Sequence, residues 1–249
     1  MDRLDLYLNK KGILEVAMTQ SARKLLLAIA RNPNPQKVFD KLKKGRNVHA
    51  NPYKAYEKIV QHQINLGIRS MHLPEPWNGH ISKAKILFIS SNPSIDPNEV
   101  FPRKYWADDK IVNFFDNRFK NHVTGSIPTF WEFIAKNTSW IFPDETEKMD
   151  TLDILDKYVA ITEVVHCKSE DESYIKGCLT LESQFLLPIL KEFKGEIVIF
   201  VGAIAKRFRE ENQSQLSSFT FRIAEIYHQG AEKKGLTDEK RKKDLLNQL

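Results

Sequence analysis

The sequence predicts an α/β protein: a three-layer α/β/α sandwich with a central, mainly parallel four-stranded sheet, preceded by a helical N-terminal region. Short apolar runs at 85–90, 158–162, 196–202 and 221–228 are typical of strands, and the first three are continuous enough for a sheet covered on both faces. Stretches with helical spacing alternate with these runs, which favours right-handed crossovers between parallel strands.

The N-terminal region, 1–80, is expected to be helical and to pack on the core. Apolar residues recur at helical spacing in three stretches, at 21–32, 37–45 and 55–70. Two prolines and a glycine then interrupt the pattern at 72–80, where Trp77 is expected to pack the crossover against the next layer.

The α/β domain is expected to span 81–230, followed at 231–249 by a charged C-terminal helix or tail. Helical patterns inside the domain lie at 110–119, 128–137, 179–193 and 203–211. A chain of 249 residues has room for one such domain with a helical extension.

The composition, 41% hydrophobic and 28% charged, is that of a soluble globular protein. No apolar run approaches the roughly 18 residues that a membrane span needs, and the N-terminus lacks a secretory pattern. We therefore expect a cytoplasmic protein without a membrane partner, most simply a monomer. The two cysteines, Cys167 and Cys178, are expected to be thiols.

The net charge of +6 is unevenly distributed. Eight basic and two acidic residues lie between 31 and 60, whereas acids dominate between 141 and 163. The basic stretch contains the candidate contacts to a nucleic-acid backbone: Lys41, Lys43, Lys44 and Arg46. A solvated helix face is the other interpretation of this charge.

Polar residues follow each predicted strand, where parallel sheets place their sites. They are Ser91, Asn92 and Ser94 after the first strand, Glu163, His166 and Cys167 after the second, Gly202 after the third and His228 after the fourth. No G-x-G-x-x-G, Walker or G-x-S-x-G motif is present, which argues against a dinucleotide enzyme, an NTPase and an α/β-hydrolase.

These motifs, taken in order, resemble the uracil-DNA glycosylase superfamily. ISSNPS resembles its G-x-N-P-G motif, and AITEVVHCKS with the later IVIFVGAIA resembles the T-N-V-V-K-C and V-I-V-A-L-G-x-x-A stretches. YHQG stands where the superfamily has a late His-Pro-Ser motif. The resemblance covers roughly 81–230.

The resemblance implies a monofunctional DNA glycosylase, which flips a modified or deaminated base and hydrolyses its N-glycosidic bond. By resemblance, Asn92 positions the water and His228 stabilises the leaving base. An aromatic residue stacks on the base in this family, and among Phe101, Phe115 and Phe119 we choose Phe119. The implied substrate-binding residues are Ser91, Ser94, Phe119 and Glu163.

The sequence also departs from the family. Ser90 and Ser94 replace glycines, which adopt positive φ more freely, and Gln229 and Gly230 replace the late proline and serine. Glu163 stands where related branches have an asparagine that reads uracil. An ionised glutamate only accepts hydrogen bonds, so it suits a base with an amino group, or a general base.

No cofactor or metal is expected. The four-cysteine iron–sulfur cluster of related branches is excluded within one chain, because no cysteine lies in the N-terminal half. His166, Cys167, Cys178 and His228 lack the spacing of a zinc site. Two alternatives stay open: a catalytically inactive glycosylase-fold module that binds or senses nucleic acid, and an unrelated small-molecule hydrolase that uses Glu163 and His228.

Overall fold

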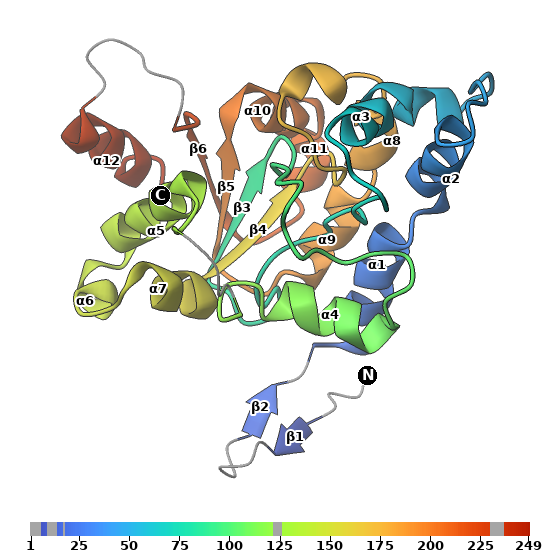
Figure 1. Ribbon diagram of the computed structural model, residues 1–249. Coiled ribbons are helices and arrows are strands. Elements are labelled where there is room, and N and C mark those ends of the chain that lie inside the picture. The colour runs from blue at the N-terminus through green and yellow to red at the C-terminus, as the bar shows by residue number, and fades with distance from the viewer. Residues whose placement is uncertain (1–5, 9–13, 17, 122–125, 230–236) are drawn as a thin grey trace.

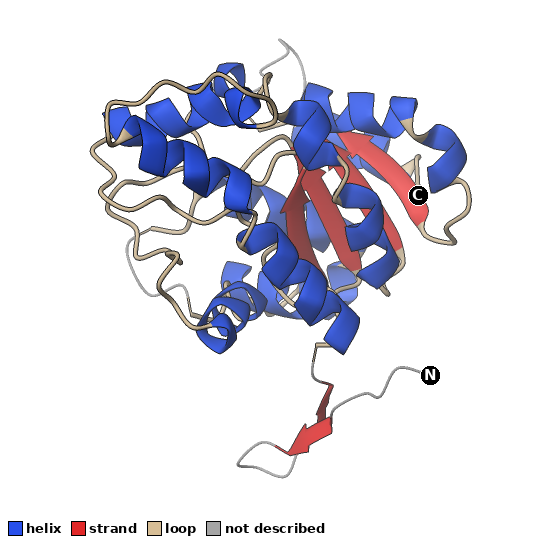
Figure 2. Cartoon of the chain, turned by 90° about the vertical axis from the view of Figure 1, so that its right-hand side faces the viewer, coloured by secondary structure: helices blue, strands red, loops and turns tan. Residues whose placement is uncertain are grey.

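The computed structural model describes residues 6–8, 14–16, 18–121, 126–229 and 237–249. Its centre is a parallel sheet with the strand order β4-β3-β5-β6. The strands are β3 (Ile86–Ser90), β4 (Val159–Glu163), β5 (Ile197–Val201) and β6 (Arg222–Ile226). Helices cover both faces of this sheet (Figures 1 and 2), which confirms the predicted three-layer fold.

Side chains that alternate along each strand divide the core into two clusters. Ile86 and Phe88 of β3 face a cluster that includes α5 (Thr129–Ile141), α7 (Thr151–Tyr158) and α12 (Asp238–Leu246). Leu87 and Ile89 face the opposite cluster, built from α1 (Gln20–Ala30), α4 (Asp108–Asp116), α9 (Leu186–Glu192) and α10 (Gly202–Glu211). We call these two sides the α5 face and the α1 face.

The chain reverses its direction across the sheet between β3 and β5. From β3 it passes through α4, α5, α6 (Pro143–Thr146) and α7 to β4 on one side. From β4 the chain passes through the 3₁₀ helix η1 (Glu172–Tyr174), α8 (Leu179–Ser183) and α9 to β5, which lies on the other side of β3. From β5 it passes through α10 and α11 (Gln213–Leu216) to β6. Such a switch point opens a crevice outside the carboxyl ends of the strands.

The N-terminal region contains the three predicted helices: α1, α2 (Pro33–Leu42) and α3 (Tyr53–Asn65). The antiparallel pair β1 (Leu6–Leu8) and β2 (Leu14–Val16) was not predicted. A third cluster joins α2 and α3 to the segment after β4 through Val165, Cys167, Ile175 and Cys178. Trp77 is fully buried in the core cluster of the α1 face, as expected.

Both edges of the sheet are closed by segments that are not strands. Asn78 lies beside β4 and exchanges two backbone hydrogen bonds with Ile161 of that strand. At the other edge, the side-chain amide of Gln248 accepts from the backbone N–H of Glu225 at 2.8 Å and donates to its carbonyl oxygen at 3.1 Å. These contacts occupy groups that an open edge would offer to another chain.

One predicted segment differs from the structure. The single helix expected over 179–193 is divided into α8 and α9, and Pro188 lies in the first turn of α9, where its missing N–H is tolerated. The expected C-terminal helix or tail at 231–249 contains the helix α12, while its first part, 231–236, lies outside the described residues. Among the described helices, none has the length and apolar character to span a membrane.

Candidate functional site

Four residues lie in a row at the carboxyl ends of the strands, and we call this row the rim. In sheet order they are Glu163, the last residue of β4; Asn92, two residues after β3; Gly202, the first residue of α10; and His228, two residues after β6. Neighbouring strands are about 4.8 Å apart, so the row spans roughly 14 Å.

The loop after β3 is fixed by hydrogen bonds to the chain after β4. The backbone N–H groups of Val164 and Val165 donate to the carbonyl oxygens of Ser90 and Ser91, each at 2.9 Å. Every described residue with positive φ is a glycine, so Ser90 and Ser94 adopt this loop without left-handed backbone. The two serine substitutions therefore carry no backbone strain. Ser91 is buried and Ser94 is exposed.

Asn92 is half-buried and held by its amide nitrogen. That nitrogen donates to the Ser169 hydroxyl at 2.9 Å and to the Pro93 carbonyl oxygen at 3.2 Å. Within the described part of the chain, the Asn92 amide oxygen accepts no hydrogen bond. The side chain thus has a fixed orientation and an oxygen available to accept from a water or a ligand.

Glu163 is buried, with 3% of its surface exposed, and its Oε2 has no hydrogen-bond partner among the described residues. Burial raises the pKa of this carboxyl well above its ordinary value, and the nearby Glu75 carboxylate raises it further, against the opposing effect of Lys168. These effects favour the neutral, protonated form of Glu163. In that form the carboxyl donates one hydrogen bond and accepts another, unlike the ionised glutamate expected from the sequence.

An ion cluster lies next to Glu163, made of Glu75, Lys168, Glu99 and Arg118. The ammonium of Lys168 is 2.9 Å from a Glu75 oxygen and 3.3 Å from a Glu99 oxygen, and Arg118 pairs with Glu99. Burial alone would raise the pKa of Glu75, but Lys168 and Arg118 hold it below its ordinary value. The cations thus favour the ionised form of Glu75, and burial beside Glu75 favours the protonated form of Glu163.

His228 stacks on Phe130 from the first turn of α5, with ring centroids 5.5 Å apart and ring planes 15° apart. Partial burial lowers the pKa of His228, and the Glu172 carboxylate opposes this shift. The imidazole is therefore mainly neutral at pH 7, with one N–H donor. Gly202 has φ +82°, and a Cβ there would lie 3.7 Å from the Cβ of His228.

The structure corrects the expected role of Phe119. Its side chain is fully buried, packs edge-to-face on Trp131 at 4.9 Å and lies against Gly79. It is therefore a core residue that offers no face to a base; Phe101 and Phe115 are buried as well. The aromatic residue at the rim is Phe130. The sequence predicts that Phe130 lies at the start of a helix. Helical spacing does not show that this end of the helix lies beside the carboxyl ends of the strands.

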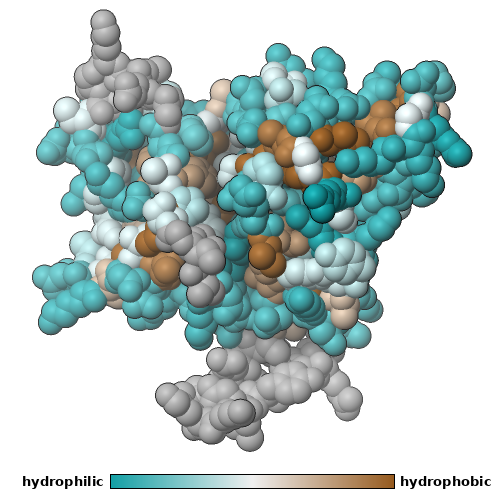
Figure 3. All heavy atoms as spheres, in the orientation of Figure 1, coloured by the Kyte–Doolittle hydropathy of each residue, from teal (hydrophilic) through white to brown (hydrophobic). Residues whose placement is uncertain are grey.

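The predicted backbone-contact residues Lys41, Lys43, Lys44 and Arg46 lie at the end of α2 and in the turn that follows. None of the four forms an ion pair within the described residues, and the ammonium of Lys41 lies 5.1 Å from the Tyr53 ring centroid. In Figure 1 this segment is at the upper right, the side toward which the strands point. In Figure 3 this view of the surface is mainly hydrophilic, with apolar residues gathered in several separate patches.

The cysteine and histidine residues after β4 are packing residues. Cys167 and Cys178 are buried, and burial together with Glu182 raises the pKa of both thiols. The Nδ1–H of His166 donates to the backbone oxygen of Glu75 at 2.9 Å, and burial lowers the pKa of His166 to about 4. In the part of the chain that the structure describes, no three His, Cys, Asp or Glu side chains are placed to share a metal ion.

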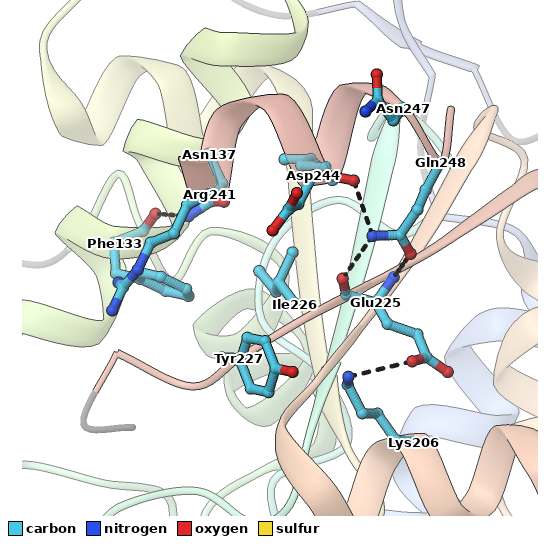
Figure 4. Close-up of a pocket in the computed structure, with 11 residues that line it drawn as sticks. Phe133, Asn137, Lys206, Glu225, Ile226, Tyr227, Arg241, Asp244, Asn247 and Gln248 are labelled. Carbon is cyan, nitrogen blue, oxygen red and sulfur yellow. Dashed lines mark hydrogen bonds and ion pairs between the residues drawn. The ribbon is translucent and has the colours of Figure 1, made fainter. Parts of the chain in front are cut away.

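A separate pocket of about 390 Å³ lies behind β6, between α5, α10 and α12 (Figure 4). Phe133, Tyr227 and Arg241 are among its lining residues, and Lys206 pairs with Glu225 at 3.1 Å on one side. None of the rim residues lines this pocket.

Comparison of the chain with models of protein families and with curated proteins finds no match.

Proposed function

We propose that this protein hydrolyses an N-glycosidic bond in the manner of a DNA glycosylase, with a modified or deaminated base as the leaving group. One observation carries the proposal: an amide oxygen, a carboxyl that burial shifts toward its neutral form and a mainly neutral imidazole lie along the carboxyl end of the sheet, on both sides of the topological switch point. These groups suit a reaction whose transition state separates a cationic sugar from an anionic base.

Two rim residues, Asn92 and His228, have defined tasks in this reaction. The Asn92 oxygen accepts a hydrogen bond from a water and holds the water's oxygen toward the anomeric carbon. As the C–N bond breaks, its electron pair leaves with the base, and the His228 N–H donates to an oxygen on which charge develops. The water adds hydroxide to the sugar, and its remaining proton ends on the base.

The proposed substrate is a nucleotide within DNA, bound partly through its phosphates. Lys41, Lys43, Lys44 and Arg46 are free of ion pairs in the described residues and are therefore available to phosphate oxygens. Each phosphate contact adds about 0.9 to the salt dependence of binding to duplex DNA. Replacement of the three lysines by glutamate is expected to weaken DNA binding and to lower that slope by about 2 to 3.

The test is a base-release assay on single- and double-stranded oligonucleotides that contain uracil, hypoxanthine, xanthine, 5-hydroxymethyluracil or mismatched thymine. We expect the wild type to leave abasic sites, and Asn92→Ala or His228→Ala to lower the rate by about 100-fold or more. Asn98→Ala, which changes an exposed asparagine in the same loop, is the matched control. Salt-dependent DNA binding without base release would instead favour an inactive binding module.

One observation favours a small-molecule hydrolase as the second candidate. Glu170, Asp171 and Glu172 are consecutive exposed acids beside the rim, and the charge of Glu172 acts on His228. Such a group repels a phosphate backbone but tolerates an uncharged nucleoside. Release of base from free nucleosides, with no effect of salt or of the lysine substitutions, would support this candidate over the DNA enzyme.

A further inference from the structure

Glu163 has an unused, buried hydrogen-bonding group at the carboxyl end of β4. Buried polar atoms in proteins are nearly always paired. Glu163 is 3% exposed and ends β4 at the rim, yet its Oε2 has no partner within the described residues. Neither the water-positioning role of Asn92 nor the leaving-group role of His228 uses this carboxyl.

Two charged groups act directly on Glu163: Glu75, in the segment that covers the β4 edge, and Lys168, after β4. Glu99, after β3, extends the cluster by pairing with Lys168 and with Arg118, after α4. The Lys168 ammonium contacts Glu75 and Glu99 and makes no hydrogen bond to Glu163. When two buried carboxyls share one neighbourhood, the carboxyl that is paired with cations ionises and the other retains its proton.

We propose that Glu163 recognises the leaving base as a neutral carboxyl group, and that Glu75 is the positioning residue that maintains this form. The ligand presents one donor beside one acceptor, as the N–H and carbonyl of uracil or hypoxanthine do. The carboxyl O–H donates to the carbonyl, and the carboxyl C=O accepts from the N–H. The inference rests on the proposed function only for the kind of ligand, and it requires no hydrolysis.

The test measures binding of free uracil and hypoxanthine by calorimetry across pH, with the wild type, Glu163→Gln and Glu163→Ala. In the wild type, the binding constant should fall about tenfold per pH unit once Glu163 ionises. Glu163→Gln keeps one donor and one acceptor, so its binding should not follow this pH dependence. Glu163→Ala should bind weakly at every pH. Benzamidine, a planar cation with two donors, probes the ionised carboxylate.

Glu75→Gln tests the positioning role. Removal of the neighbouring negative charge should lower the pH midpoint of uracil binding relative to the wild type. Glu210→Gln, which changes an exposed acid on α10, should leave this midpoint unchanged. An unchanged midpoint in Glu75→Gln would overturn the role of Glu75. Normal binding in Glu163→Ala, absence of uracil binding in the wild type, or loss of binding in Glu163→Gln together with tight benzamidine binding would each overturn the role of Glu163.

These outcomes separate the inference from the proposed function. Base release that depends on Asn92 but not on the protonation of Glu163 would leave the glycosylase standing and remove the inference. Uracil binding with the expected pH dependence, in a protein that releases no base, would keep the inference and remove the proposed catalysis.

Discussion

Lys168→Met should strongly destabilise the protein, because it leaves a buried carboxylate without its main counter-ion. Lys168 and Glu75 are 5% and 6% exposed, and their charged atoms are 2.9 Å apart. At an effective dielectric constant of 20, this separation corresponds to an attraction of about 6 kcal/mol, much of it offset by the desolvation of both groups. Loss of one partner from such a pair costs about 3–5 kcal/mol.

We expect the low end of that range, about 3 kcal/mol, because Asn78 and Arg118 still stabilise the Glu75 carboxylate. Urea unfolding at pH 7 measures the change through the midpoint and the slope. Arg207→Ala, in the exposed pair Arg207–Glu211, is the control and should leave the urea midpoint nearly unchanged.

The double variant Lys168→Met/Glu75→Gln should recover at least about 1 kcal/mol relative to Lys168→Met, because the orphaned charge is gone. A Lys168→Met variant as stable as the Arg207→Ala control would refute the argument. So would strict additivity of the two substitutions, since it would show that Lys168 and Glu75 do not interact.

Three further predictions concern other parts of the molecule. Tyr56→Phe removes a 2.5 Å hydrogen bond to the buried Glu182 carboxyl and should cost about 1–3 kcal/mol in urea unfolding. Gly202→Ala places a side chain at φ +82° and should cost about 1–2 kcal/mol in the same measurement. Burial lowers the pKa of His166 to about 4 from 6.5, so the unfolded chain binds more protons between these values. Stability should therefore fall by about 3 kcal/mol as pH drops through this window, and His166→Gln should lack that part of the loss.

The sheet and the end at which the rim forms were predictable because they depend on local patterns. The apolar runs marked β3, β4 and β5, and parallel topology brings Asn92, Glu163 and the residues after β6 to one edge. The prediction failed where the answer depends on tertiary packing. Phe119 and Phe130 both follow the first strand, and only the placement of α5 shows that Phe119 is buried while Phe130 stacks on His228.

The environment that favours a protonated Glu163 could not be predicted from the sequence, for the same reason. Glu75 belongs to the irregular segment before β3, and nothing in its local pattern indicates that it lies beside the end of β4. Its backbone N–H donates to the His166 carbonyl oxygen at 2.8 Å, and its own carbonyl accepts from the His166 ring at 2.9 Å. These bonds position the Glu75 carboxylate beside the Lys168 ammonium.

The closure of the β4 edge and the chemistry of the rim are therefore one structural arrangement. The segment that pairs Asn78 with Ile161 also contains Glu75, whose charge adds to the effect of burial in favouring the protonated form of Glu163. A change that loosens this segment without altering any rim residue should remove Glu75 from Lys168 and Glu163 together. The carboxyl at the end of β4 would then lose a neighbouring negative charge and a neighbouring cation at once, and gain water. Its pKa would return toward the ordinary value of a glutamate, and its ability to donate a hydrogen bond at neutral pH would be lost.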